Sequence, residues 1–126
     1  MSVQVLVATM DQQNHDLLDK MNIRSEAIVG NQCAYNSIEK FEHKGKKVVY
    51  LNFNEKGVGL NRNNALMRAY GDICLFADDD MVYVDDYVEK VENAFQRYPQ
   101  ADVIIFNLIE KHPTRFVIKR NMIVSY

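Results

Sequence analysis

Apolar residues along this chain fall into short runs separated by amphipathic stretches. Runs with the length and β-branched content typical of strands cover residues 3–9, 26–30, 48–53, 72–77 and 102–110. Apolar residues at helical spacing occur in residues 17–21, 61–70 and 84–98, and a last extended stretch covers residues 115–126. This alternation predicts an α/β fold with a Rossmann-like, mostly parallel sheet and helices on both faces.

Two segments carry more specific expectations. The continuous apolar run at residues 72–77 is typical of a central parallel strand covered on both faces. Gly71 precedes this run, where the end of the predicted helix favours a residue that tolerates positive φ. The basic stretch at residues 40–47 is interpreted as a solvated charge run and is assigned no function.

Size and charge narrow this picture. A length of 126 residues suits one compact domain, so residues 1–126 are predicted to form a single domain. The 15 basic and 17 acidic side chains give a formal net charge of -2, which disfavours nucleic-acid binding. No apolar run approaches the ~20 residues that span a bilayer. We therefore expect a cytoplasmic protein, with peripheral association at the inner face of the membrane left open.

Polar residues follow three of the predicted strands. Thr9 to Asp11 end the first strand, Asn31 and Gln32 end the second, and Asp78 to Asp80 follow the run at residues 72–77. Parallel strands send their C-terminal ends to one rim of the sheet, which is where open α/β sheets bind ligands. The three groups are therefore expected to converge on one site.

Three consecutive aspartates, Asp78, Asp79 and Asp80, form the most distinctive of these groups. Neighbouring carboxylates disfavour one another's ionised form unless a cation or hydrogen-bond donors compensate. If the extended geometry continued through the triplet, Asp78 and Asp80 would project to the same side. Oxygen ligands suit Mg²⁺ or Mn²⁺, with substrate phosphates completing the coordination shell.

Other interpretations of the triplet must be weighed. It could be a solvated turn that caps the following helix. Receiver domains and haloacid-dehalogenase phosphatases also use aspartates for phosphate chemistry, but both place key aspartates after the first strand. Here the first strand ends Ala8-Thr9-Met10-Asp11, with a single acid, and no later strand ends with the lysine that a receiver domain needs.

The segment at residues 54–80 resembles the core of family 2 glycosyltransferases. It contains, in order, a glycine-bearing loop, Arg62 and Asn63 at the start of a helix, Gly71 and Asp72, an apolar strand, and the D-x-D of the triplet. The resemblance extends weakly to residues 5–9 and 87–107. It implies the A fold of nucleotide-diphospho-sugar transferases.

The resemblance also implies roles for individual residues. The donor-binding set that it indicates is Thr9, Asp11, Asn31, Arg62, Asp78 and Asp79. Asp78 and Asp80 would hold the metal ion. Asn31 stands where relatives usually have an aspartate that contacts the base, so the base preference is not simply inherited, because an amide both donates and accepts hydrogen bonds. Arg62 would place its guanidinium near the diphosphate.

From this resemblance we expect the chain to be the metal-dependent, nucleotide-sugar-binding domain of an inverting glycosyltransferase in polysaccharide or glycoconjugate synthesis. Its partners would be a nucleotide-diphospho-sugar donor and a saccharide or glycoconjugate acceptor. The catalytic base is unknown and is expected beyond Tyr126, with the acceptor half. The alternative is a catalytically silent nucleotide-sugar-binding or assembly module. An exposed sheet edge is also expected to allow a homodimer.

Overall fold

The structure of the chain is a computed structural model that describes residues 2–54 and 68–106. The chain divides into two compact units, Met1–Glu92 and Asn93–Tyr126, and each is described by itself. The first unit contains all the described strands, and the second begins inside the last helix. The polar groups that bear on function belong to the first unit.

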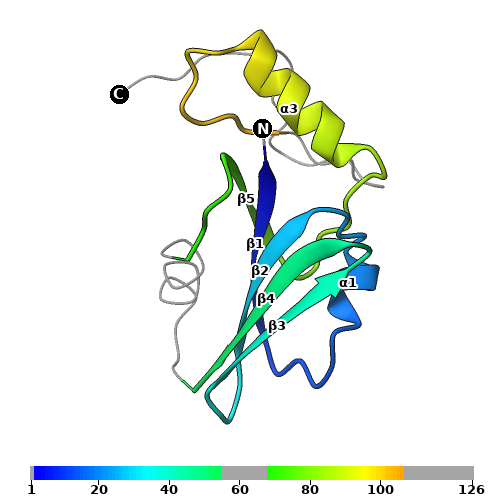
Figure 1. Ribbon diagram of the computed structural model, residues 1–126, viewed down its shortest axis with the longest axis vertical. Coiled ribbons are helices and arrows are strands. Elements are labelled where there is room, and N and C mark those ends of the chain that lie inside the picture. The colour runs from blue at the N-terminus through cyan, green and yellow to red at the C-terminus, as the bar shows by residue number, and fades with distance from the viewer. Residues whose placement is uncertain (1, 55–67, 107–126) are drawn as a thin grey trace, which may run out of the picture. The chain divides into compact units, whose positions relative to one another are not determined.

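Five strands form one sheet in the described part of the first unit (Figure 1). They are β1 (Val3–Met10), β2 (Glu26–Gln32), β3 (Ser37–His43), β4 (Lys46–Phe53) and β5 (Ile73–Asp78). Their order is β3-β4-β2-β1-β5. β1 pairs in parallel with β2 and with β5, and β2 pairs in parallel with β4, whereas β3 and β4 are antiparallel. The prediction of a mostly parallel sheet is confirmed.

β4 matches the strand predicted at residues 48–53, but it forms a hairpin with β3, which the sequence does not predict and which overlaps the stretch interpreted as a solvated charge run. The two residues between the strands, Lys44 and Gly45, have φ angles of 51° and 76°, which suit a tight two-residue hairpin turn. Most side chains of β3 are exposed, as expected for a charged stretch, but Phe41 packs against the core. The sequence pattern misses this edge strand because it has too few apolar residues to resemble a strand.

Side chains of β1 alternate between two apolar clusters, since successive residues of a strand point to opposite faces of the sheet. Val5 and Val7 belong to the larger cluster, which also contains the buried leucines of the short helix α1 (Leu17–Lys20). Leu6 and Ile28 belong to the smaller cluster. β1 is therefore buried on both sides, which fixes the position of the polar residues at its end.

The segment before β5 differs from the prediction. Most of the helix predicted at residues 61–70 lies outside the described residues, and residues 68–70 are not helical. Helices on both faces of the sheet therefore stay a prediction. Gly71 does not adopt positive φ. It is needed for close approach instead, because a Cβ on Gly71 would lie 2.7 Å from the Cβ of Gln4.

The position of β5 bears on the expectation of a central strand. The apolar run at residues 72–77 predicts a central strand, but β5 lies at one end of the described sheet, beside β1. Ile73 and Ala77 are buried, whereas the Phe76 side chain is half exposed. A central place for β5 in the whole sheet stays a prediction, because residues 107–126 lie outside the described residues.

The helix predicted at residues 84–98 is confirmed as α3 (Tyr87–Arg97), which begins three residues later than expected. Tyr87 and Val91 are its buried residues. The Tyr87 hydroxyl lies 2.7 Å from Ser25 Oγ and accepts a hydrogen bond of 2.8 Å from the backbone N–H of Arg24. The start of the helix is thus tied to the residues that precede β2. No helix in the described ranges is long and apolar enough to cross a membrane.

Residues 102–106, in the second unit, do not form the strand predicted for residues 102–110. Val103 and Ile105 are largely exposed. A strand needs a neighbour to pair with its backbone groups, and residues 102–106 pair with no described strand. The remainder of that predicted strand and the stretch at residues 115–126 lie outside the described residues.

Candidate functional site at the C-terminal edge of the sheet

The loop after β1 turns sharply at Asp11. This residue has φ of 54°, in the left-handed region that aspartate tolerates better than most residues. Its backbone N–H donates a hydrogen bond of 2.8 Å to the carbonyl of Gln32, at the end of β2. The Asp11 side chain is exposed at this edge. The predicted meeting of the ends of β1 and β2 is therefore confirmed.

Asn31 holds the next residue of the loop. Its side chain is almost completely buried, with 1% of its surface exposed. Asn31 Oδ1 accepts a 3.0 Å hydrogen bond from the backbone N–H of Gln12, and Asn31 Nδ2 donates one of 3.0 Å to the carbonyl of Gln12. Nδ2 also donates to Asn52 Oδ1, at 2.8 Å. The amide expected to meet a base is thus engaged with the protein itself.

A second group of contacts connects the loop to the acidic triplet. The Thr9 hydroxyl donates a hydrogen bond of 2.8 Å to Asp79 Oδ2 and accepts one of 3.0 Å from Gln12 Nε2. Thr9 is buried, with 6% of its surface exposed. Two of the predicted donor-binding residues, Thr9 and Asp79, are therefore in direct contact. The three polar groups expected to converge do so at one edge of the sheet.

The triplet itself does not keep the extended geometry. β5 ends at Asp78, and Asp79 and Asp80 form a turn in which the N–H of Met81 approaches the carbonyl of Asp78 at 3.2 Å. The expectation that Asp78 and Asp80 project to the same side required an extended backbone through the triplet, and the backbone is not extended there. All three aspartates are exposed. Within residues 2–54 and 68–106, no group of three or more His, Cys, Asp or Glu side chains is arranged to hold a metal ion.

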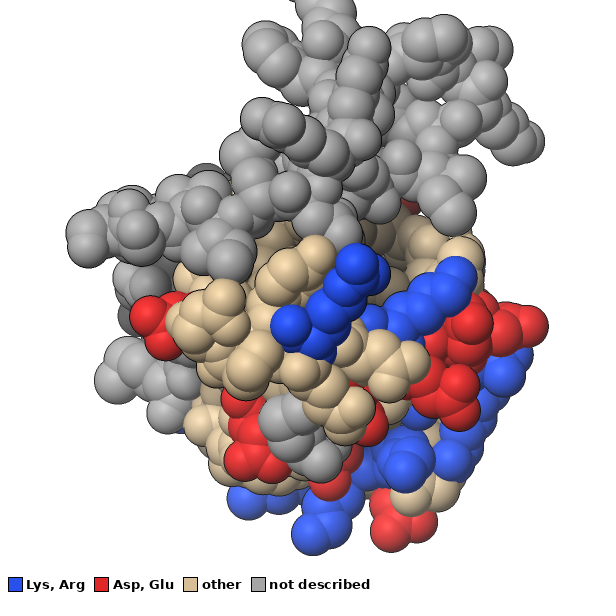
Figure 2. Space-filling model, turned by 90° about the horizontal axis from the view of Figure 1, so that it is seen from above, with Lys and Arg blue, Asp and Glu red and all other residues tan. Residues whose placement is uncertain are grey.

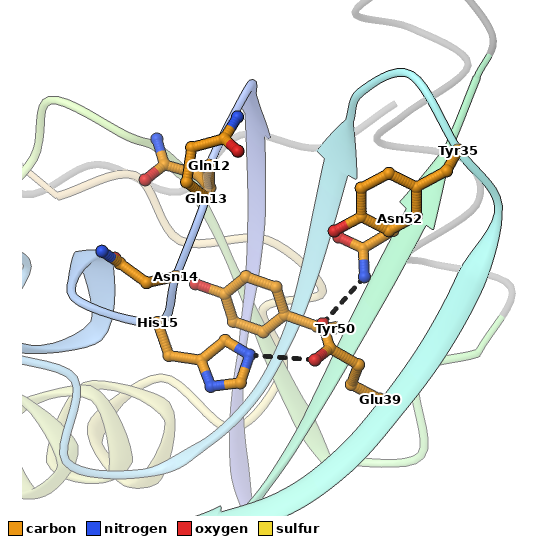
Figure 3. Close-up of a pocket in the computed structure, with 8 residues that line it drawn as sticks. All are labelled: Gln12, Gln13, Asn14, His15, Tyr35, Glu39, Tyr50 and Asn52. Carbon is orange, nitrogen blue, oxygen red and sulfur yellow. Dashed lines mark hydrogen bonds and ion pairs between the residues drawn. The ribbon is translucent and has the colours of Figure 1, made fainter.

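A small polar pocket of about 50 Å³ opens beside the loop, on the side of β3 and β4 (Figure 3). It is lined by Gln12, Gln13, Asn14, His15, Tyr35, Glu39, Tyr50 and Asn52. The His15 ring stacks on Phe41, with ring centroids 4.2 Å apart, and lies 4.6 Å from the ring of Tyr50. The rings of His15 and Tyr50 form an aromatic part of the lining, and the amides of Gln12, Gln13, Asn14 and Asn52 form a polar part.

Glu39 and Tyr50 have perturbed acidities in this pocket. The hydrogen bond of 2.8 Å from Asn52 Nδ2 is the main reason that the pKa of Glu39 is lowered, and His15, at 3.4 Å, adds to it. Burial raises the pKa of Tyr50 to about 12, with a further contribution from Glu39. The Tyr50 hydroxyl is buried without a hydrogen-bond partner among the described residues.

Sequence reasoning missed three residues of this edge. Asn52 ends β4 as Asn31 ends β2, and the same argument from strand ends could have identified it. Gln12 bonds to Asn31 through its backbone, which carries no sequence signal, and to Thr9 through its side chain. Glu39 reaches the site because β3 pairs with β4, and that strand was not predicted. Arg62, by contrast, was predicted but lies outside the described residues.

Charge is mixed on the surface of the molecule. The face in Figure 2 carries acidic and basic side chains close together, in keeping with the small net charge of the chain. Charged side chains at the edge described above include Glu39 and the aspartates from Asp78 to Asp80. An exposed group of carboxylates attracts cations more readily than free anions.

Comparison with known families gives a match over most of the chain. The model of "Glycosyl transferase family 2" matches residues 26–123, well over half of the chain. The matched range includes Asn31, Asn52 and the whole triplet, whereas β1 and its loop precede it. Comparison with curated proteins and with solved structures gave no significant match.

Proposed function

Because the chain belongs to glycosyl transferase family 2, we propose that it binds a nucleotide-diphospho-sugar together with Mg²⁺ or Mn²⁺ at the C-terminal edge of its sheet. Membership of the family implies a glycosyltransferase domain of the A fold, which binds a nucleotide sugar. The observation that carries the proposal is the contact between Thr9 and Asp79, because it joins the end of β1 to the acidic triplet. The proposed site thus lies where open α/β sheets bind ligands.

The triplet is the metal-binding end of the proposed site. Asp78 and Asp80 are exposed carboxylates at a strand end, and carboxylate oxygens are the ligands that Mg²⁺ and Mn²⁺ prefer. One or two protein carboxylates are enough when substrate phosphates complete the shell, so a cluster of three protein ligands is not required. When bound, the cation would offset the charge that develops on the leaving diphosphate.

The pocket beside the loop is the proposed nucleoside end. β5 and β4 are separated by three strand spacings, or roughly 14 Å along the edge. This length leaves room for a nucleoside near Asn52 and a diphosphate near the triplet. Thr9 and Gln12 lie between the two ends. Direct contact with the base would come from groups of the pocket, since the amide of Asn31 is engaged with Gln12 and Asn52.

For the chemistry, we propose inverting transfer of the sugar to a saccharide or glycoconjugate acceptor. The residues of the described edge would serve donor binding and stabilisation of the leaving group, not proton transfer. Sustained transfer or hydrolysis of a sugar nucleotide by the chain, abolished by Asp80→Ala, would distinguish an enzyme from a silent binding module. Binding without turnover would support the silent module instead.

Calorimetry with UDP-, GDP- and dTDP-sugars, with and without Mn²⁺, tests the donor site. We expect binding that requires Mn²⁺ and is weakened at least about tenfold in Asp80→Ala. Asp86→Ala is a matched control, because it removes an exposed carboxylate of the first unit that lies away from the triplet and pairs with Lys90 at 3.5 Å. Failure of all three nucleotide sugars to bind in the presence of Mn²⁺ would refute the proposal.

A further inference from the structure

We propose that Asn31 is a positioning residue, whose amide fixes the backbone of Gln12 and so holds the loop after β1 against the donor site. The inference concerns how this chain builds the edge, and its consequence for donor binding rests on the proposed function. It assigns Asn31 a role in the protein's own geometry instead of contact with the base.

The contacts of Asn31 define the role. One side chain satisfies both the N–H and the C=O of the same residue, Gln12, with two hydrogen bonds of 3.0 Å. Because both bonds form within a buried site, the peptide groups on either side of Gln12 are fixed in orientation. The preceding residue, Asp11, has a positive φ that costs free energy unless its surroundings hold it there. Asn31 supplies that constraint.

Further hydrogen bonds connect the loop to the acidic triplet. With its backbone held, Gln12 directs Nε2 to the Thr9 hydroxyl, which in turn donates to Asp79. A continuous series of hydrogen bonds therefore runs from Asn31 on β2 to the turn after β5. Loss of the hydrogen bonds between Asn31 and Gln12 would leave Gln12 free to move away from Thr9. It would not remove any exposed carboxylate.

The geometry also requires an amide and not a carboxylate. Asn31 Nδ2 donates to two acceptors, the Gln12 carbonyl and Asn52 Oδ1. A carboxylate has no proton for either. Asn52 cannot simply turn its amide round, because Asn52 Nδ2 donates to Glu39 Oε2 at 2.8 Å, and the turn would place an oxygen against that carboxylate. The hydrogen bond between Asn52 and Glu39 therefore fixes the orientation of the Asn52 amide, and Asn52 Oδ1 in turn requires Asn31 to present Nδ2.

Hydrogen exchange in the ligand-free protein tests the inference directly. In Asn31→Asp we expect the amide of Gln12 to exchange at least about tenfold faster, while amides in the centre of β1 keep their wild-type protection. Asn36→Asp is the matched control, since Asn36 Oδ1 only accepts a bond from the N–H of Asn54 and a carboxylate can do the same. Unchanged exchange at Gln12, or equal acceleration across the sheet, would overturn the assignment.

The pH dependence separates positioning from a general loss of packing. A carboxyl group introduced at position 31 regains one donor when protonated, and its buried surroundings raise its pKa. Protection of the Gln12 amide in Asn31→Asp, relative to intrinsic exchange, should therefore recover as the pH is lowered through the raised pKa of the introduced carboxyl. Asn36→Asp should show no such recovery. A pH-independent defect in Asn31→Asp would contradict the proposed donation to Gln12 and Asn52.

Binding measurements then test the connection to the donor site. We expect Asn31→Asp and Gln12→Ala each to weaken binding of UDP or GDP with Mn²⁺ by about tenfold, and Asn36→Asp to have no effect. Gln12→Ala also serves if Asn31→Asp does not fold, because it leaves the backbone contact with Asn31 in place and removes the side chain that bonds to Thr9 and lines the pocket. If the wild-type chain binds no nucleotide, the proposed function fails, while the exchange experiment still decides the role of Asn31.

Discussion

The two ends of the C-terminal edge are built in opposite ways. At the β2 and β4 end, Asn31 and Asn52 are buried and hydrogen-bonded to the protein, with 1% and 4% of their surfaces exposed. At the β5 end, the aspartates from Asp78 to Asp80 are exposed. Buried amides satisfied by one another define a shape before any ligand arrives, whereas exposed carboxylates retain their capacity for a cation. We therefore expect substitutions at the first end to reduce stability, with or without an effect on binding, and those at the second to reduce binding alone.

The largest effect is expected from Tyr50, at the buried end. Its pKa is raised to about 12 in the folded state, against 10.0 for an ordinary tyrosine. The unfolded chain therefore ionises first as the pH rises, and the stabilising effect is complete below pH 10 and lost between pH 10 and pH 12. Two pKa units correspond to roughly 2.7 kcal/mol. In Tyr50→Phe this part of the alkaline loss should be absent.

Denaturant unfolding of both proteins across this pH range provides the measurement. Tyr35→Phe is a suitable control, because Tyr35 lines the same pocket but its side chain is half exposed. If the free energy of unfolding depended on pH in the same way in the wild-type protein and in Tyr50→Phe, the Tyr50 hydroxyl would be solvated. That result would contradict the view that this end of the edge is buried and the other exposed.

A slightly smaller effect is expected from Asn52→Ala. This substitution removes the acceptor of Asn31 Nδ2 and the donor to Glu39 and Ser37. Loss of a buried, hydrogen-bonded amide should lower the free energy of unfolding by about 2 kcal/mol. Asn54→Ala, two residues further along and exposed, should change it by less than about 0.5 kcal/mol. Equal effects of the two substitutions in chemical denaturation would contradict the view that this end is prebuilt.

The sequence predicts the sheet better than the connections within its edge. β1, β2, β4 and β5 follow from apolar runs, and the convergence of Thr9, Asn31 and Asp79 follows from the rule that parallel strands end at one rim. The side-chain geometry does not follow from that rule. It depends on the path of the loop at Gln12, whose backbone meets Asn31 and whose side chain meets Thr9.

Two misses have related causes. β3 is an edge strand with exposed, charged side chains, so its pairing with β4 is invisible to hydrophobic patterns. Gly71 was expected to end a helix, but its role depends on the approach of Gln4, a residue far away in the sequence. Both are contacts between distant segments, which local patterns do not encode.

At the exposed end, binding and stability should separate. Asp80→Ala should weaken Mn²⁺-dependent nucleotide binding at least tenfold, or by about 1.4 kcal/mol. It should change the free energy of unfolding by less than about 0.5 kcal/mol, because Asp80 is exposed. Calorimetry and denaturant unfolding of the same preparation measure both quantities. A large loss of stability with unchanged binding would reverse the roles assigned to the two ends.

The smallest effect concerns the acidity of Glu39, which lies between the buried amides and solvent. Its pKa is lowered from 4.5 chiefly by the hydrogen bond from Asn52. The resulting stabilisation is therefore present above pH 4.5 and is lost as the pH falls through the lower pKa of the folded state. Because the side chain is 44% exposed, solvent screens the interaction and the change in stability should be slight.

An NMR titration of the Glu39 carboxyl carbon measures this pKa directly. Asn52→Ala should raise the pKa of Glu39 towards its ordinary value. His15→Phe, which preserves an aromatic ring against Phe41 but removes the weaker partner, should raise it less. The order of the two shifts decides the point. If His15→Phe had the larger effect, Glu39 would belong with the exposed charges of the edge, and the prebuilt part of the site would end at Asn52.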